Sequence, residues 1–323
     1  MARAPAGRAR HDRCVGSDVD ERRGLAYGVA AYLLWGLFPL YWPLLKPASA
    51  IEILAHRMLW SLAFVVMLLW WGRGFSGVRA VLADREKRTL LGCAAIVITF
   101  NWGTYIWGVN SKHVIETSLG YFINPLFTIL LGVFLLHERL RRMQWVAVGI
   151  GSVAIVVLTV DYGRLPWIAL VLATSFGLYG YFKKRASVGA VESLAIETGY
   201  LAVPALITLV VIEARGDLAF AHHGAGTTTL LVLTGAITAV PLLFFGAATR
   251  RLPLSVIGLL QYLAPVLQFA VGVGIDHESM SSARWIGFGL VWVALIVLTW
   301  DGLRPRTPAA VAQPVVVSRA TNV

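Results

Sequence analysis

The stretch EILAHR, which begins at Glu52, places three ionisable side chains inside a long apolar run. Glu52 and His56 are four residues apart, so they share one face of a helix. Histidine changes charge near neutral pH, so this pair could carry a proton, or His56 could simply be a hydrogen-bonded interface residue. A guanidinium as deep as that of Arg57 could bind an anionic group, or it could pair with a carboxylate such as Glu197.

Amide and phenol side chains occur in other apolar runs, where each must face protein or water. Asn101 and Asn124 fall at comparable depths in neighbouring runs, and Tyr121 precedes Asn124 by one helical turn. Gln261 is the corresponding candidate late in the chain. We expect these groups, with Arg57, to bind a small solute, and Glu52, His56 and Glu197 to be candidates for proton coupling. The alternative is that they join helices by hydrogen bonds.

Several kinds of chemistry lack their sequence signature. The chain has no HExxH zinc helix, no GxSxG nucleophile turn and no GxxxxGK[ST] nucleotide loop. Its two cysteines, Cys14 and Cys93, are too far apart for a metal-binding motif and give no disulfide framework. We therefore expect no metal, no cofactor and no enzymatic activity.

The elements that carry these side chains are long apolar runs. Of 323 residues, 58% are hydrophobic and only 14% are charged, against about 25% in a soluble domain. Each run approaches the roughly 20 residues that cross a bilayer as a helix. The sequence predicts an all-α membrane protein with ten transmembrane helices, at 24–45, 51–72, 90–110, 117–136, 143–161, 165–183, 193–213, 229–248, 255–275 and 283–301.

Basic residues predict how these helices are oriented. With the N-terminus in the cytoplasm, 22 of the 28 Lys and Arg residues fall on the cytoplasmic side, as the positive-inside rule requires. Topology therefore explains the net charge of +11, and we expect no nucleic-acid partner. Both termini are predicted to be cytoplasmic, with disordered tails at 1–23 and 302–323.

The chain also repeats itself at a shift of 140 residues. The matching positions include proline, glycine, a His-Glu pair and tryptophan: Pro125 with Pro265, Gly132 with Gly272, His137-Glu138 with His277-Glu278, and Trp145 with Trp285. These matches predict two five-helix repeats, 24–161 and 165–301. Because five is odd, the second repeat is inserted upside down, as in many secondary transporters.

The matched prolines lie in the middle of predicted membrane helices. Proline removes a backbone hydrogen bond and bends a helix. We expect Pro125 and Pro265 to act as hinges beside a central cavity, the alternative being simple packing kinks. The polar chemistry differs between the repeats, since Asn124 corresponds to Ala264 and Tyr121 to Gln261.

Four segments carry a family resemblance: AYLLWGLFPLYWPLL, EILAHRMLWS, NWGTYIWGVNSKHVIETSLGYFINPLFTILLGVFLLHERL and RRLPLSVIGLLQYLAP. Together with the repeat, they resemble EamA-type members of the drug/metabolite transporter superfamily, and more narrowly its RarD-type proteins, over residues 24–301. The resemblance implies a ten-helix permease of the plasma membrane.

With the inverted repeat, this favours a secondary active transporter. We expect it to export a small organic metabolite or drug, with H⁺ as a possible coupling ion and the lipid bilayer as its environment. A lipid flippase or passive channel on the same fold is the alternative, and an intramembrane enzyme is a distant third.

Overall fold

The computed structural model describes residues 8–303, except 73, 137–139, 141, 250 and 253–259. Within these ranges every regular element is helical. The helices are α1 (Arg8–Gly36), α2 (Phe38–Tyr41), the 3₁₀-helix η1 (Trp42–Leu45), α3 (Ala50–Gly72), α4 (Phe75–Ala83), α5 (Arg85–Asn110), α6 (Val114–Leu136), α7 (Arg142–Tyr162), α8 (Trp167–Ala186), α9 (Ala190–Ala214), α10 (Gly224–Thr249), α12 (Leu263–Gly274) and α13 (Ser282–Leu303).

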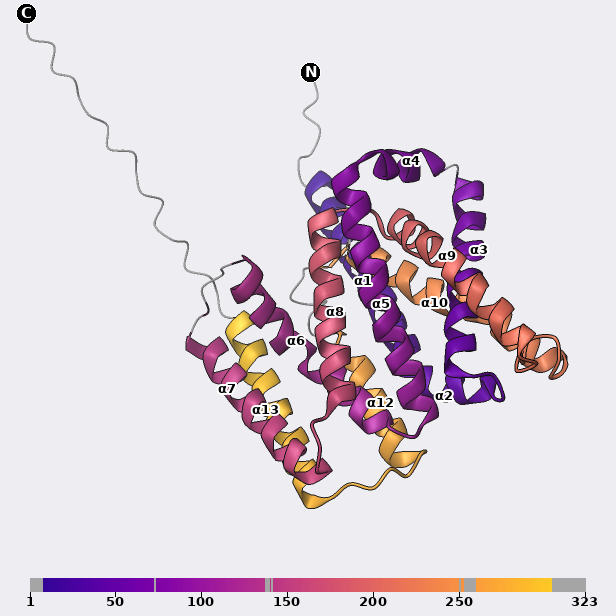
Figure 1. Cartoon of the computed structure of the whole chain (residues 1–323). Coiled ribbons are helices and arrows are strands. Elements are labelled where there is room, and N and C mark those ends of the chain that lie inside the picture. The colour runs from indigo at the N-terminus through magenta and orange to yellow at the C-terminus, as the bar shows by residue number, and fades with distance from the viewer. Residues whose placement is uncertain are drawn as a thin grey trace, which may run out of the picture.

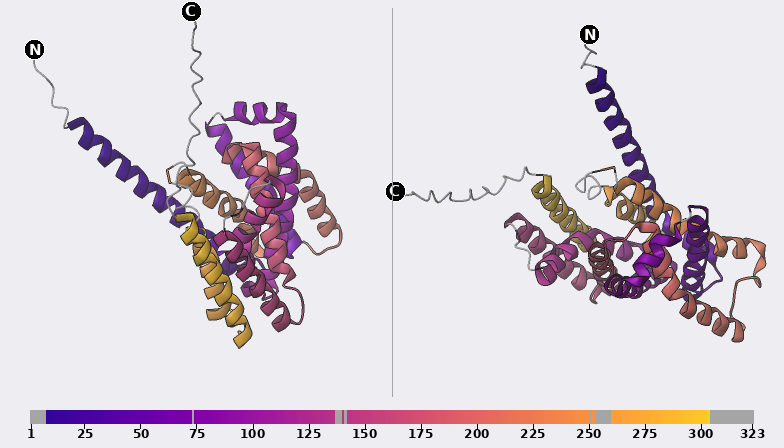
Figure 2. Two further views of the ribbon diagram at one scale, coloured as in Figure 1. Left: turned by 90° about the vertical axis from the view of Figure 1, so that its left-hand side faces the viewer. Right: turned by 90° about the horizontal axis from the view of Figure 1, so that it is seen from above.

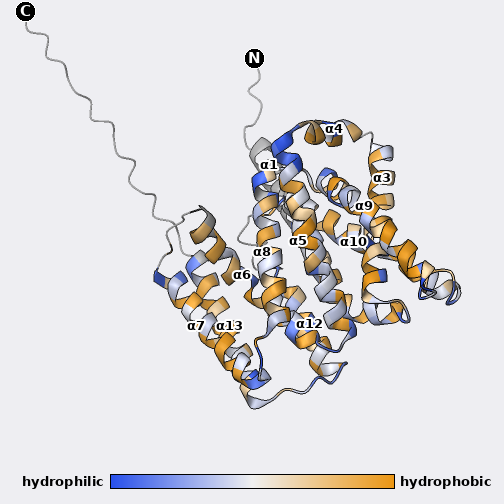
Figure 3. Ribbon diagram, viewed as in Figure 1, coloured by the Kyte–Doolittle hydropathy of each residue, from blue (hydrophilic) through white to orange (hydrophobic). Residues whose placement is uncertain are grey.

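The outward faces of these helices are apolar. Trp70, Trp71, Phe134 and Val160 are each more than 70% exposed, and Figure 3 shows that hydrophobic residues occur along the length of most helices. Exposed apolar surface on this scale would not be stable in water. Six of the described helices are long and apolar enough to cross a bilayer, or seven if the bent pair near the N-terminus counts as one span. The chain is therefore an α-helical, multi-pass membrane protein; the full number of ten spans stays a prediction.

The first predicted span, 24–45, is not one straight helix. It breaks after α1, and the axis turns by 42° into α2 and η1. Pro39 and Pro43 follow this break, and proline is tolerated in the first turn of a helix but not in its interior. In the other direction α1 begins at Arg8, within the range 1–23 predicted as a disordered tail, because no proline interrupts the sequence between Arg8 and Phe38. Figure 2 shows α1 extending beyond the bundle.

The helices pack in a small number of pairs (Figure 1). Helix α3 lies between α9 and α10, α8 lies between α5 and α6, and α7 packs along α13. Helix α10 also packs against α1, and α12 contacts both α1 and α6. The start of α1 and the end of α13 point to the side of the molecule that carries α4, whereas the loops 111–113, 163–166 and 275–281 lie at the opposite end (Figure 1).

The two matched prolines occupy different positions in their helices. Pro125 lies inside α6, while Pro265 is in the first turn of α12, which begins only at Leu263. The two helices pack against each other. Of the matched His-Glu pairs, His137-Glu138 lies outside the described residues, whereas His277-Glu278 is in the loop after α12.

Candidate functional site

Arg57 is buried in the middle of the bundle, with 3% of its surface exposed. Its Nε donates a hydrogen bond to Thr238 Oγ1 of α10, at 2.9 Å. The guanidinium carbon lies 3.9 Å from the ring centre of Trp102 on α5, 5.2 Å from that of Trp42 and 5.7 Å from that of Phe38. Arg57 is thus held by aromatic rings and one hydroxyl, and no ion pair joins it to any carboxylate in the described part of the chain.

Two of the predicted binding residues, Asn101 and Tyr121, are brought together. Tyr121 donates from its hydroxyl to Asn101 Oδ1 at 3.3 Å. The Asn101 amide donates to the Leu172 carbonyl and to Ser175 Oγ of α8, each at 3.0 Å. Tyr121 also lies close enough to Arg57 for an electrostatic interaction. Three of the predicted residues therefore surround one buried region of α3, α5 and α6.

Glu52 and His56 share a face of α3, as their spacing predicts. Glu52 Oε1 accepts from the backbone N–H groups of Ala219 and Phe220, at 2.9 and 3.0 Å, and lies 3.9 Å from His56 Nε2. The His56 ring stacks on Phe220, and its Nδ1 accepts from Trp60 Nε1 at 3.2 Å. Glu52 therefore fixes the loop after α9, and His56 lies between that loop and the interior.

The other candidates lie elsewhere. Glu197 accepts from Lys183 Nζ at 2.9 Å, from Ser193 and from Tyr179, so it is satisfied between α8 and α9 and is not the partner of Arg57. Gln261 forms a hydrogen bond with Tyr262 at the start of α12. Asn124 is buried, and its Oδ1 has no hydrogen-bond partner among the described groups.

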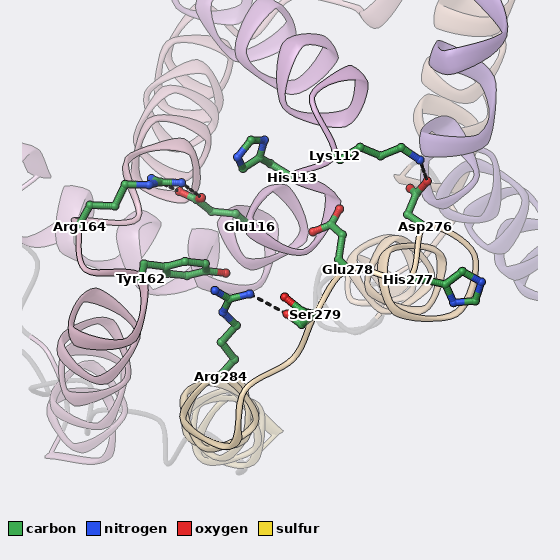
Figure 4. Close-up of a pocket in the computed structure, with 10 residues that line it drawn as sticks. All are labelled: Lys112, His113, Glu116, Tyr162, Arg164, Asp276, His277, Glu278, Ser279 and Arg284. Atoms are coloured by element: carbon green, nitrogen blue, oxygen red, sulfur yellow. Dashed lines mark hydrogen bonds and ion pairs between the residues drawn. The ribbon is translucent and has the colours of Figure 1, made fainter.

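A polar pocket of about 510 Å³ occupies the loop end of the molecule (Figure 4). We call it the loop pocket; it is lined by Lys112, His113, Glu116, Tyr162, Arg164, Asp276, His277, Glu278, Ser279 and Arg284. Three ion pairs surround it: Lys112 with Asp276 at 2.5 Å, Arg164 with Glu116 at 2.7 Å, and Arg284 with Asp161 at 2.8 Å. These pairs connect loops and helix ends that are far apart in the sequence.

Glu278 lies in the centre of this pocket. Its carboxylate accepts from the backbone N–H groups of Val114 and Ile115, at the N-terminus of α6. Such free N–H groups and the positive end of the helix favour a negative charge. Burial has the larger effect and raises the pKa of Glu278 to about 7, while the two backbone hydrogen bonds oppose it.

Comparison with known proteins decides the family. The EamA-like transporter family matches residues 22–160. Protein RarD from Streptomyces exfoliatus is 56% identical, over 88% of this chain and 90% of that protein. The chain belongs to the EamA-like transporter family. It is thus a membrane transporter of the drug/metabolite transporter superfamily, which confirms the resemblance read from the sequence.

Other relatives of this EamA-like chain agree. The uncharacterized transporter YojE from Bacillus subtilis (strain 168) is 39% identical, over 88% of this chain and 96% of that protein. Protein RarD from Escherichia coli (strain K12) is also 39% identical, over 87% of this chain and 95% of that protein. A solved crystal structure aligns with a TM-score of 0.56 at 18% identity, covers 87% of this chain and 99% of its own, and shares the overall fold.

The sequence reasoning missed the loop pocket of this EamA-like transporter. The predicted span 255–275 places Asp276, His277 and Glu278 in the loop that follows it, and the sequence assigned them no binding role. A signal was present, because Lys112, Arg164 and Arg284 are among the few basic residues outside the predicted cytoplasmic segments. A basic residue that departs from the positive-inside pattern needs another reason for its position, and here each pairs with a carboxylate.

Proposed function

We propose that this chain is a secondary carrier that exports a small organic solute across the plasma membrane by alternating access of two inverted halves, 24–161 and 165–301. In this proposal ten spans surround a central site that contains Arg57, Asn101 and Tyr121. Pro125 and Pro265 serve as hinges, and Glu52 with His56 is the candidate proton-coupling pair.

The observation that carries the proposal is that the helix packing keeps its pattern when the halves are exchanged. Exchanging the halves replaces α1, α3, α5, α6 and α7 by α8, α9, α10, α12 and α13, in that order, and the reverse. The α5–α8 pair then becomes α10–α1, the α6–α8 pair becomes α12–α1, and the α3–α10 pair becomes α9–α5. All six of these packings occur. The pairs α3–α9, α6–α12 and α7–α13 are converted into themselves. Two halves that can exchange their packing can exchange an inward-open for an outward-open cavity.

The loop pocket supports the idea that contacts between the two proposed halves close one end of the central cavity. Lys112 and Asp161 belong to the first half, and their partners Asp276 and Arg284 belong to the second. Glu278 of the second half also binds the start of α6 in the first. The positive-inside pattern assigns these loops to the outer side. We therefore interpret this conformation as one in which polar contacts between the halves close the outer end.

A transport assay tests the carrier. A metabolite comparison between deletion and overexpressing cells first identifies the solute whose distribution depends on the protein. That solute is then measured in inverted membrane vesicles with and without an imposed pH gradient. A carrier shows saturable uptake and accelerated exchange when unlabelled solute is present on the opposite side. Uptake without saturation or exchange would identify a channel and overturn the proposal.

A further inference from the structure

We propose that the buried site around Arg57 binds the carboxylate of a small organic monoanion with an apolar, ring-sized body. This inference deepens the proposed carrier function, on which its physiological meaning rests. It names the class of solute, which the family and its relatives leave open.

The first argument is the charge of Arg57. A charged group inside a membrane helix is unfavourable, so it is usually paired with an opposite charge. In the described part of the chain only Thr238 accepts a hydrogen bond from it. Glu197, the carboxylate expected from the sequence, is already bound to Lys183. The positive charge of Arg57 is therefore available for a ligand.

The second argument is that other hydrogen-bond donors near Arg57 are also unused. Trp42 Nε1 and the hydroxyl of Tyr105 are buried and have no partner among the described groups. The Trp42 ring centre lies 5.2 Å from the Arg57 guanidinium carbon, and Tyr105 is buried in the same cluster as Trp42 and Phe38, the rings that face Arg57. Buried polar groups are rarely left without a partner. A cation with two unused donors beside it is complementary to an oxyanion.

The third argument concerns the net charge of the occupied site. One carboxylate neutralises the single positive charge of Arg57 and can accept both of the remaining hydrogen bonds. A phosphate dianion would leave one negative charge uncompensated in an apolar interior, which is unfavourable. The site therefore favours a monoanion.

The surroundings determine what the rest of the solute is. Phe38, Trp42 and Tyr105 are buried in one apolar cluster, against which Trp35, Tyr41 and Tyr121 are packed. Rings present flat apolar surfaces and weakly polar edges to a ligand. A solute with a planar or otherwise compact apolar body can replace ring–ring contacts here without requiring further hydrogen bonds.

Binding can be measured without any transport assay. The full chain is purified in detergent, and its unfolding temperature is followed by intrinsic tryptophan fluorescence with benzoate, benzamide, benzylamine or inorganic phosphate added. We expect concentration-dependent stabilisation by benzoate only, because benzamide has nearly the same shape without the charge. Equal stabilisation by benzoate and benzamide would show binding by shape alone and would overturn the proposal, as would stabilisation by phosphate in preference to benzoate.

Three variants assign the binding to this site. Arg57→Gln is expected to abolish benzoate stabilisation, whereas Arg215→Gln, at an exposed position after α9, leaves it unchanged. Tyr105→Phe keeps the ring and removes only a donor, whereas Trp42→Phe removes a donor and part of the ring, and each is expected to weaken benzoate binding by roughly threefold to tenfold. Tyr105→Phe is not expected to destabilise the empty protein, because its hydroxyl has no partner among the described groups. Trp42→Phe leaves a cavity in the core, so its benzoate response is measured against its own unfolding temperature without ligand.

These two phenylalanine variants keep the proposal falsifiable if Arg57→Gln does not fold. Benzoate binding that is unchanged in both would place the ligand elsewhere and overturn the inference. The result is also separable from the carrier proposal. Benzoate binding at Arg57 in a protein that shows no solute exchange would contradict the carrier alone, and normal exchange in a protein indifferent to benzoate would contradict the carboxylate site alone.

Discussion

At the scale of single residues, Glu52 shows how a buried carboxylate can be structural. Its Oε1 atom accepts two backbone hydrogen bonds from the loop after α9. Replacing it by alanine leaves two buried N–H groups without an acceptor, at about 1–3 kcal/mol each. We predict that Glu52→Ala lowers the unfolding temperature clearly, while Glu52→Gln, which keeps an amide oxygen as acceptor, lowers it less.

Glu213→Ala is the matched control for this prediction, because Glu213 is half exposed and pairs only with the exposed His222 in the described structure. A comparable loss of stability in Glu52→Gln and Glu52→Ala would show that the negative charge matters rather than the accepted bonds. That outcome would favour a role of Glu52 in proton coupling over a structural role in holding the loop after α9.

His56 is the residue at which proton coupling can be tested most directly. Its Nδ1 accepts from Trp60, and a glutamine oxygen can accept the same bond. Imidazole changes charge near neutral pH and glutamine does not. We predict that His56→Gln flattens the pH dependence of solute exchange while preserving the folded protein. His222→Gln, at an exposed position, should keep the parent profile. An unaltered profile in His56→Gln would show that protons are transferred elsewhere or not at all.

At the scale of elements, apolar runs predicted most helix positions to within a few residues. The run at 51–72 is α3, which begins at Ala50, and the run at 143–161 is α7, which begins at Arg142. Hydropathy could not reveal the break after Gly36, because α2 and η1 continue the apolar run that ends α1. Nor could it identify the neighbours of Arg57. Thr238 and Trp102 come from α10 and α5, and only tertiary packing brings them to α3.

The contact between α3 and α10 depends on one glycine. A Cβ atom at Gly235 would lie 2.3 Å from the carbonyl oxygen of Trp60, which is far inside van der Waals contact. Small residues allow such close approach between membrane helices. Because Thr238 is one turn further along α10, this approach also places its hydroxyl beside Arg57. Gly235 therefore supports both the packing and the site.

We predict that Gly235→Val destabilises the protein by several kcal/mol, the usual range for overpacking being about 1–3 or more. It should also weaken solute binding at Arg57. Gly226→Val is the control on the same helix, since a Cβ there meets no atom within 4 Å. Thermal unfolding of the two variants in detergent measures the difference. Equal unfolding temperatures would show that α3 and α10 can separate without cost.

At the scale of the whole molecule, the proposed alternation between a closed and an open loop end makes a prediction about pH. The closed pocket raises the pKa of Glu278 to about 7 by burial, whereas an exposed glutamate titrates near its ordinary value of about 4.3. The closed state therefore binds a proton more tightly than an open one. Its stability relative to the open state falls as the pH rises from about 4.3 to about 7 and changes little above that.

The charged and titratable groups that face Glu278 come from every surrounding segment. They are Lys112 and His113 before α6, Glu116 on α6, Tyr162 at the end of α7, Arg164 after α7, Asp276 and His277 on its own loop, and Arg284 on α13. Glu278 interacts unfavourably with Asp276 and favourably with Lys112. Deprotonation of Glu278 adds a negative charge to a partly buried network, and opening the pocket to water relieves that cost.

We predict that the loop end, which the positive-inside pattern predicts to face outward, opens more often above about pH 7. Thr117, buried in the first turns of α6, is replaced by cysteine in a chain without Cys14 and Cys93, and its labelling by a membrane-impermeant thiol reagent is timed. Thiol ionisation itself depends on pH, so the informative quantity is the labelling rate relative to the same chain with Glu278→Gln, which cannot deprotonate. This ratio should rise at least about threefold between about pH 5 and pH 8, allowing for solvent screening of a half-exposed group. A constant ratio would mean that deprotonation of Glu278 does not shift the equilibrium between the proposed closed and open states. The ion pairs of Lys112 and Arg284 would then have to stabilise the closed state alone.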